Sequence, residues 1–339
     1  MNDLRLALRQ VARSPFFHGV AVLVLALGIG ANSAMFSLIN ALVLRPITAV
    51  RPADLVGIYS REEKPEGGYR AFSYPNYADL RAGNEAFSDI AAFTMSMVGL
   101  REGEVTRRAF AGVVSANYLR AFGLRPALGR EFTAAEEQDP GARVAMVSDA
   151  WWRRNGADPA LIGRTLTLNG LPFTVVAVAP PGFTGTTALF SPDVWVPIGG
   201  GSHLANDFTG RNHKNLQDRS SHQFMLVGRL RPGTSIEAAR ARLEPLARQL
   251  AAAYPAENKD RNLEVHPLPR LSVTTRPQTN APLGALAALL LPMSGLVLLI
   301  ACLNLANMLL ARAATRRREM AIRLALGGGQ IGRASCRER

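Results

Sequence analysis

The sequence has 339 residues, of which 48% are hydrophobic and 19% are charged, an apolar content that excludes an intrinsically disordered chain. The formal net charge is +13, but the basic excess is densest beside two long apolar segments and thin across the region between them. This pattern argues against a nucleic-acid-binding protein, which concentrates basic and aromatic residues on one surface. We therefore expect a folded protein, part of which folds in lipid.

Residues 1–18 are predicted to form an amphipathic helix at the cytoplasmic face of a membrane. Apolar residues recur there at helical spacing, opposite three arginines, Arg5, Arg9 and Arg13. A basic face opposite an apolar face is typical of helices that lie in the membrane interface.

Residues 19–44 carry no formal charge and are predicted to form the first transmembrane helix. A membrane-spanning helix needs about 20 predominantly apolar residues. The alternative is a cleaved signal peptide, with Ala31 and Ser33 placed at a cleavage site. The apolar region of a signal peptide is only about 7 to 15 residues long, and this segment is longer, which favours a membrane span.

Small residues recur along the first span at about four-residue spacing and predict a close contact with another helix. The alternative is that small residues are simply common in membrane helices. The predicted helix-packing residues are Ala26, Gly30, Ala34, Ser37 and Ala41.

A second uncharged run covers residues 277–311, and its apolar part, 281–311, is predicted to form the second transmembrane helix. Its length disfavours the alternative of a buried core helix. Pro292 lies inside it and is tolerable there, because neighbouring helices can satisfy the carbonyl that proline leaves free.

The arginines that flank the spans predict the orientation of the chain. Three precede the first span, and Arg312, Arg316, Arg317, Arg318 and Arg323 follow the second. Because basic residues beside a span stay in the cytoplasm, both ends are expected inside and residues 45–276 outside. The two cysteines, Cys302 and Cys336, both lie beyond this exported region. A packed core must therefore stabilise it without a disulfide.

The exported region alternates strand and helix signals, which predicts an α+β domain. A β-α-β-β unit is expected first, with a strand at 55–62, a helix at 73–93 capped by Ser73, and a hairpin turning near Glu102 and Gly103. A late β-α-β unit is expected to complete it, with a strand at 223–230, a helix at 235–254 and a strand at 261–271.

A second, small α/β unit is expected to be inserted at about residues 125–221. It holds a strand and helix at 143–156, a strand at 193–198, and a hairpin whose Asn169-Gly170 turn is a strong type I′ signal. A polar loop at 199–221 follows and is a candidate for contact with a partner.

The sequence predicts no catalytic, cofactor-binding or metal site. The chain has only three lysines, and none stands in the G-K-[ST] context of a nucleotide-binding loop. His203, His213 and His222 share one polar loop, but their spacing matches no metal motif. An acidic cluster at Glu136, Glu137 and Asp139 is interpreted as a surface turn, with paired acid–base catalysis as the alternative.

Four segments together resemble the permease subunits of MacB/FtsX-type ABC transporters, most closely the long duplicated permeases abundant in acidobacteria. They are "LRLALRQVARSPFFHGVAVLVLALGIGANSAMFSLINALVLRP", "FSYPNYADLRAGNEAF", "GRTLTLNGLPFTVVAVAPPGF" and "LLARAATRRREMAIRLALGG". The resemblance implies a first span, a periplasmic domain made of a porter-like unit with an inserted small unit, and three further spans. Only one of those three is present in this sequence.

The same resemblance implies that residues 312–330 hold a coupling helix that docks on an ATPase subunit, because "RRREMAIRLALG" matches that helix. Glu319 and Arg323 would form an i, i+4 pair beside a small apolar patch. The alternative is a basic flank that anchors the span to acidic lipid headgroups. The residues assigned to coupling are Arg316, Arg317, Arg318, Glu319, Ile322, Arg323 and Leu326.

The resemblance implies a non-catalytic permease subunit of the bacterial inner membrane that is multi-pass, binds no cofactor itself and relies on ATP bound by a partner. The implied partners are an ABC-type ATPase, membrane lipid, a second permease copy and a periplasmic adaptor. The alternatives are a membrane-anchored periplasmic sensor or scaffold without an ATPase, and a regulator of cell-wall hydrolases. The sequence does not indicate the substrate.

The last nine residues, "IGRASCRER" at 331–339, have neither apolar periodicity nor a helix cap. They can be encoded by codons that resemble a widely used sequencing-adaptor sequence read in one frame. We therefore expect that they are not natural protein, that the sequence is an N-terminal fragment, and that the gene continues beyond about Gln330.

Overall fold

The computed structural model describes residues 15–40, 47–64, 66–186, 191–204, 215–269 and 274–325. The chain divides into two compact units. Unit 1 comprises Met1–Leu44 and Ala281–Arg339, and unit 2 comprises Arg45–Asn280. The predicted interfacial helix before Pro15, together with Ala41, His213, Leu326 and the tail at 331–339, lies outside the described residues.

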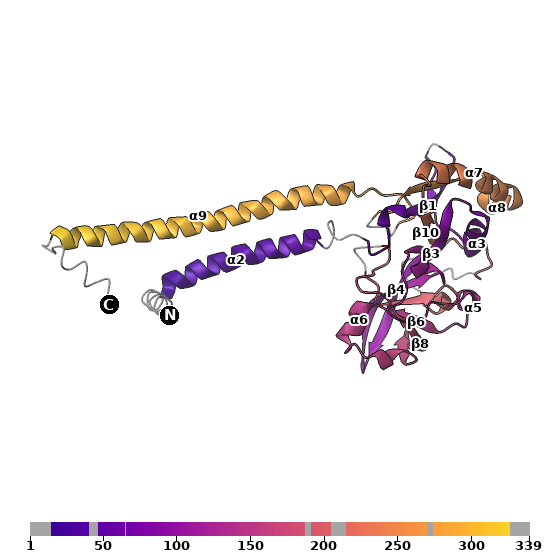
Figure 1. Cartoon of the computed structure of the whole chain (residues 1–339), viewed down its shortest axis with the longest axis horizontal. Coiled ribbons are helices and arrows are strands. Elements are labelled where there is room, and N and C mark those ends of the chain that lie inside the picture. The colour runs from indigo at the N-terminus through magenta and orange to yellow at the C-terminus, as the bar shows by residue number, and fades with distance from the viewer. Residues whose placement is uncertain are drawn as a thin grey trace. The chain divides into compact units, whose positions relative to one another are not determined.

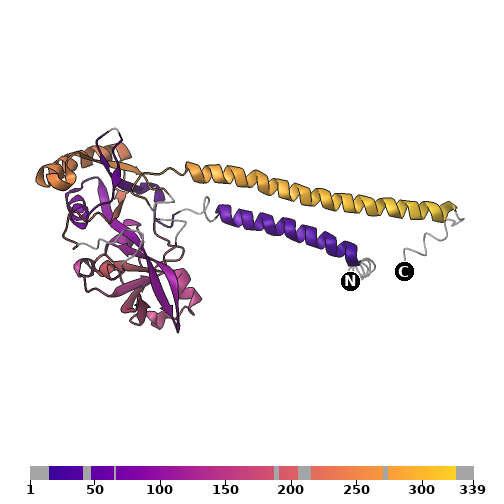
Figure 2. The same ribbon diagram turned by 180° about the vertical axis from the view of Figure 1, so that it is seen from behind.

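Unit 1 is a pair of apolar helices, α2 (Pro15–Ile39) and α9 (Ala281–Ala325), which run side by side in both views (Figures 1 and 2). Both are long and apolar enough to cross a membrane, over Gly19–Ser37 and Gly284–Ile322. At 1.5 Å per residue, the 45 residues of α9 extend about 67 Å, roughly twice the hydrocarbon thickness of a bilayer. The predicted second span therefore continues without a break into the segment assigned to coupling.

Unit 2 is built on one eleven-stranded sheet with the strand order β11-β1-β10-β3-β4-β9-β6-β8-β5, in which β2 also pairs with β1, and β7 with β3 and β8. Strands β11, β1, β10, β3 and β4, which we call the outer half of the sheet, come from the predicted β-α-β-β unit and the predicted late β-α-β unit. Its elements are β1 (Leu55–Glu62), β2 (Tyr69–Arg70), α3 (Tyr74–Gly83), β3 (Phe87–Glu102), β4 (Val105–Val114), α4 (Tyr118–Ala121), β10 (Met225–Leu230), α7 (Ile236–Ala253), α8 (Pro255–Asn258) and β11 (Arg261–Pro267).

Three sequence predictions for this half are confirmed. The first strand occupies the predicted residues, and the β3–β4 hairpin turns at Gly103, whose φ of 62° suits glycine. Ser73 caps α3, since its side chain accepts a hydrogen bond from the Asn76 amide at 3.3 Å.

The helix predicted over 73–93 is wrong in its second half, because residues 87–93 belong to strand β3. The helix ends at Gly83, and the backbone of Asn84 is already extended. The Asn84 side chain then accepts a hydrogen bond from the Phe87 amide at 3.0 Å. Pairing of this segment with β10 and β4 satisfies its backbone groups and overrides the helical spacing of its apolar residues.

The inserted segment completes the sheet instead of forming a separate one. Strand β9 pairs with β4 in parallel, and β7 pairs with the far end of β3. The β7–β8 hairpin turns at Asn169 and Gly170, with φ of 49° and 80°, which confirms the predicted type I′ turn. The elements are β5 (Leu128–Gly129), α5 (Ala134–Gln138), β6 (Val144–Val147), α6 (Asp149–Arg154), β7 (Thr165–Leu168), β8 (Leu171–Val178), β9 (Val194–Pro197) and the 3₁₀ helix η4 (Gly199–His203).

Apolar side chains are buried on both faces of the sheet. Successive residues of one strand alternate between two core clusters, as Val194 and Val196 do against Trp195. The Trp195 indole lies over Gly112, where an added Cβ would stand 2.3 Å from the ring. The core thus continues through both halves and makes unit 2 one packed body.

Candidate functional site

The two helices of unit 1 touch along a seam that contains polar groups. Gly28 is buried against α9, and a Cβ added there would lie 2.8 Å from the Ala301 Cβ. One turn further along, Asn32 donates to the Gly28 carbonyl at 3.0 Å and accepts a hydrogen bond from the Ser294 hydroxyl. Because hydrocarbon cannot satisfy polar groups, this pair fixes the register of the two helices.

The small-residue stripe predicted for helix packing does not face α9. Ala26, Gly30, Ala34 and Ser37 are all exposed in unit 1, whereas the seam runs through Gly28 and Asn32 on another face of α2. The stripe therefore stays a prediction about a helix other than α9. Sequence reasoning missed Asn32 and Ser294, although a polar side chain inside an apolar span is itself a signal.

The segment assigned to coupling forms the last turns of α9. Arg317, Arg318 and Ile322 are exposed, and the apolar side chains of Met320 and Ile322 are 59% and 52% exposed. The side chains of Arg316, Glu319 and Arg323 lie outside what the structure describes, as does all of Leu326. The predicted Glu319–Arg323 pair and the coupling role stay predictions.

The acidic cluster is not a uniform surface turn, and the interpretation is wrong for Glu137. Glu136 forms a capping box with Thr133 and an ion pair of 2.6 Å with Arg130, whose hydrogen bonds lower the pKa of Glu136. Asp139 accepts a hydrogen bond from the Gly141 amide. Glu137, by contrast, has only 3% of its surface exposed.

Glu137 joins the inserted segment to the outer half of unit 2. Its carboxylate accepts hydrogen bonds from the Ala116 amide at 2.7 Å and the Tyr74 hydroxyl at 3.2 Å, and it lies 3.9 Å from the Arg81 guanidinium. Burial, together with this carboxylate, raises the pKa of Tyr74 to about 12. The Glu137 carboxylate thus joins α5 to α3. The sequence around the acidic residues did not indicate this contact.

A second cluster of charge lies next to Glu137, at the junction where the inserted segment leaves the outer half. Asp89 of β3 pairs with Arg120 at 2.8 Å and lies 4.0 Å from Arg81. Asn117 donates to the Ile90 carbonyl at 2.8 Å and accepts a hydrogen bond from Tyr77. These contacts hold α3, β3 and α4 together around two arginines, Arg81 and Arg120, and two carboxylates, those of Asp89 and Glu137.

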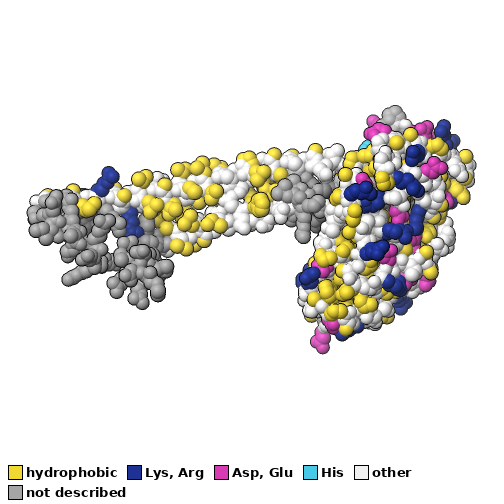
Figure 3. Space-filling view, in the orientation of Figure 1, with side chains coloured by type: hydrophobic (Ala, Val, Ile, Leu, Met, Phe, Trp, Pro, Cys, Tyr) yellow, Lys and Arg dark blue, Asp and Glu magenta, His cyan; other side chains and the backbone are white. Residues whose placement is uncertain are grey.

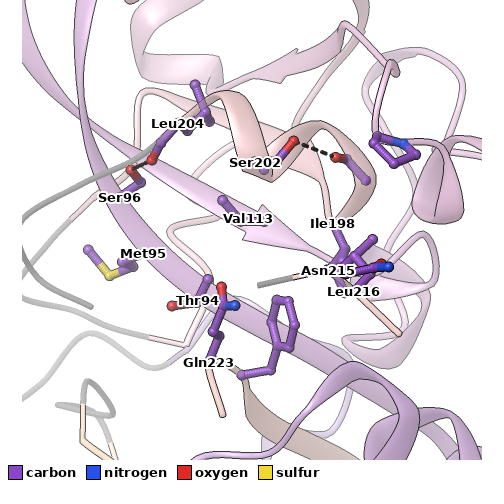
Figure 4. Close-up of a pocket in the computed structure, with 14 residues that line it drawn as sticks. Thr94, Met95, Ser96, Val113, Ile198, Ser202, Leu204, Asn215, Leu216 and Gln223 are labelled. Atoms are coloured by element: carbon purple, nitrogen blue, oxygen red, sulfur yellow. Dashed lines mark hydrogen bonds between the residues drawn. The ribbon is translucent and has the colours of Figure 1, made fainter. Parts of the chain in front are cut away.

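A cavity of about 380 Å³ lies between the middle of β3 and η4, and its lining residues are all uncharged (Figure 4). Ser96 donates a hydrogen bond to the Leu204 carbonyl across it, and Ser202 bonds to Gly199 within η4. No lining side chain among the described residues is an acid, a base or a cysteine. The described residues thus give the cavity a neutral, partly apolar lining.

Part of the loop predicted as polar and available to partners is buried. Gly199, Gly200 and Gly201 pack so tightly that a Cβ on Gly200 would stand 2.3 Å from the Ala142 carbonyl oxygen. The three glycines therefore permit a close approach of η4 to the sheet. The stretch 205–214 of the same loop lies outside the described residues.

The two histidines of that loop that the structure describes contact different groups. His203 contacts the Pro140 carbonyl at 2.8 Å, and His222 lies 3.3 Å from Glu257. Across the part of the chain that the structure describes, no three His, Cys, Asp or Glu side chains gather as metal ligands.

The main features of the structure are thus a pair of apolar helices, of which α9 is long and ends in a basic segment, and an α/β domain. Residues 19–246 match the family of the MacB-like periplasmic core domain. The chain therefore belongs to this family, the MacB/FtsX-type permeases of ABC transporters, and unit 2 contains its periplasmic domain. Permeases of this family work with ATPase partners.

Solved structures of such domains are similar to the chain. A domain of a putative permease from Porphyromonas gingivalis is 16% identical with a TM-score of 0.47, over 67% of this chain and 95% of that one. The periplasmic region of MacB from Actinobacillus actinomycetemcomitans is 15% identical with a TM-score of 0.45, over 65% and 91%.

The extracellular domain of the noncanonic ABC-type transporter YknZ from Gram-positive bacteria is 14% identical with a TM-score of 0.43, over 62% and 99%. Comparison with curated proteins gives no match. The likeness to acidobacterial permeases stays a prediction.

Proposed function

We propose that this chain is a permease subunit that couples ATP hydrolysis by a partner ATPase to movement of its periplasmic domain. The movement would serve efflux or another export-type task on a molecule outside the inner membrane. ATP would be bound and hydrolysed by the partner, with no cofactor on this chain.

The observation that supports the proposal is the continuity of α9. A single helix of 45 residues includes the apolar span and the arginine-rich segment up to Ala325. A helix without a proline or glycine break after the span transmits displacement along its axis better than a hinged connection. Its two prolines, Pro282 in the first turn and Pro292, both lie before the basic segment.

The exposed side chains at the end of α9 suit a protein partner. Arg317 and Arg318 lie beside Met320 and Ile322, whose apolar surfaces are more than half exposed. Acidic lipid headgroups would attract the arginines, whereas a docking surface on a protein partner would contact both the arginines and the apolar side chains that follow them. A second permease copy and a periplasmic adaptor are further partners that this proposal includes.

Replacement of Glu319 by Lys together with Ile322 by Asp tests the proposed ATPase contact. In the full-length protein we expect capture of the partner ATPase to fall several-fold while membrane insertion is unchanged. The matched control makes the same changes in unit 2, at the exposed residues Glu244 and Ile162. Equal capture by both variants would leave only the lipid-anchor interpretation.

Nucleotide binding separates this proposal from the alternatives. The purified chain alone should bind no ATP above background, and the chain with its partner should hydrolyse it. An absent ATPase partner, with a kinase or hydrolase encoded beside the gene, would favour a membrane-anchored sensor or a regulator of cell-wall hydrolases.

A further inference from the structure

The segment that follows the first span in the chain, residues 47–54, is bonded to both halves of unit 2. The Val50 amide donates to the Phe122 carbonyl, just after α4, at 3.0 Å. The Thr48 hydroxyl donates to the Gly182 carbonyl, beyond β8 of the inserted segment, at 2.8 Å. We call residues 47–54 the connecting segment.

A buried arginine on β10 fixes the connecting segment to the sheet. Arg229 has 8% of its surface exposed, and its Nη1 donates to the Val50 carbonyl at 2.7 Å. Its Nε donates to the Ala121 carbonyl of α4, also at 2.7 Å. The nearest acid is Asp54, at 3.9 Å, and burial lowers the pKa of the Arg229 guanidinium against the attraction of that carboxylate.

Stability alone does not account for the burial of this charge. Removing a guanidinium from water carries a large desolvation cost, and an apolar side chain of similar volume often serves a core equally well. The planar fork of arginine, however, can bond two carbonyls in a fixed relative position, which no apolar side chain can do. The two carbonyls belong to the connecting segment and to α4.

A glycine lets the connecting segment come this close. Gly123 has φ of 70°, and a Cβ added to it would stand 2.9 Å from the Val50 Cβ. Arg51, the residue after Val50, also has a positive φ, 45°, where the segment turns into the short helix Pro52–Asp54. The close contact with Gly123 and the hydrogen bond from the buried Arg229 guanidinium thus both fix the position of Val50.

We propose that Arg229 is the positioning residue through which movement of the first span is passed to unit 2. The inference rests on the proposed coupling function. Strand β10 lies between β1 and β3 in the sheet, so a force on Val50 acts on the middle of the outer half instead of stretching a linker. The bond from Thr48 to Gly182 carries the same force to the inserted segment.

The test uses the full-length permease with its partner ATPase in lipid vesicles and a spin-label pair. One label replaces Val105, 68% exposed at the β3–β4 turn, and the other replaces Leu310, 67% exposed on α9, with Cys302 changed to serine. Pulsed electron paramagnetic resonance then measures the label distance with and without ATP. We expect an ATP-dependent shift in the parent protein and loss of that shift in Arg229→Met, at an unchanged rate of ATP hydrolysis.

Arg231→Met is the matched control, since Arg231 is exposed two residues further along, and it should keep the full shift. Arg229→Lys should keep part of it. Should Arg229→Met fail to fold, Gly123→Ala carries the same test, because its methyl group displaces Val50 while the arginine remains. Absence of any shift in the parent would overturn the proposed function, whereas equal shifts in the parent and the variants would overturn only the role of Arg229.

Discussion

The two units of this chain contain similar apolar residues, but these are buried in unit 2 and exposed in unit 1. In unit 2, the large apolar side chains of Phe122 and Trp195 are 0% and 1% exposed. In unit 1, Leu27 and Leu289 are 65% and 60% exposed. Figure 3 shows apolar side chains along the helices and charged side chains over the surface of unit 2.

The difference shows which solvent each unit requires. Unit 2 completes its core within the protein, and its surface charges suit water. The helices of unit 1 bury only a narrow seam against each other, and both are long and apolar enough to cross a membrane, where lipid would cover the rest of their apolar surface. A substitution should therefore have opposite consequences in the two units, according to the solvent that its side chain meets.

A charge in the middle of α9 should have the largest effect. Leu298→Arg places a guanidinium on a side chain that is 45% exposed within the span, and insertion should become unfavourable by about 2.5–3.5 kcal/mol. The same change at Ile162, 36% exposed in unit 2, should alter neither insertion nor stability measurably. The fraction of each variant that resists alkaline extraction from membranes measures its insertion. Equal extraction of the two variants would contradict the interpretation that α9 lies in lipid and unit 2 in water.

Loss of a core aromatic ring should destabilise unit 2 strongly. Phe122 is fully buried, with its ring centroid 5.1 Å from that of Tyr118 and 5.2 Å from that of Phe183. We expect Phe122→Ala to lower the free energy of unfolding of unit 2 by about 3–5 kcal/mol. Val105→Ala, at an exposed turn, is the control. Denaturant unfolding followed by tryptophan fluorescence compares them, and a similar midpoint for both would show that the Phe122 site is not tightly packed.

Alkaline pH should destabilise unit 2 through its buried tyrosines. The pKa of Tyr74 is about 12 in the fold, raised by burial and by Glu137, compared with 10.0 for a free side chain. The folded state therefore holds this proton more tightly, and its stabilising contribution is complete below pH 10 and is lost as pH rises through about 12. Tyr74→Phe should lose less stability over this range, as measured by circular dichroism against pH. An identical pH dependence would show that Tyr74 titrates normally.

The polar contact between the helices should have the smallest effect. A double-mutant cycle with Asn32→Ala and Ser294→Ala should give a coupling free energy of about 0.6 kcal/mol, the average for hydrogen bonds between membrane helices. Unfolding of the protein in detergent micelles supplies the four free energies. Ser33→Ala, on an exposed face of α2, should show no coupling to Ser294. Strictly additive effects of Asn32 and Ser294 would mean that the hydrogen bond is absent in the micelle.

Local signals in the sequence were sufficient where the chain's own chemistry decides the structure. The Ser73 cap and the Asn169-Gly170 turn each depend on neighbouring residues only and appear where expected, and the two charge-free runs form helices long and apolar enough to cross a membrane. The segment 87–93 has the spacing of a helix but becomes a strand, because β10 and β4 supply partners that lie distant in sequence.

The candidate site could be predicted only in outline. An arginine-rich segment after an apolar span is visible in the sequence, and so is a polar residue such as Asn32 within a span. Neither Glu137 nor Arg229 could be recognised as buried, because both are charged residues in otherwise ordinary contexts. Their burial depends on carbonyl and amide groups brought to them by other elements.

The sequence by itself determined where the two long apolar helices lie, since an uncharged apolar run can be recognised from composition alone. The tertiary structure decided how the segments are joined: that the inserted strands extend one sheet, that α9 is continuous to Ala325, and that Arg229 holds the connecting segment. Such contacts link residues up to 179 positions apart, and no short stretch of the chain contains both partners.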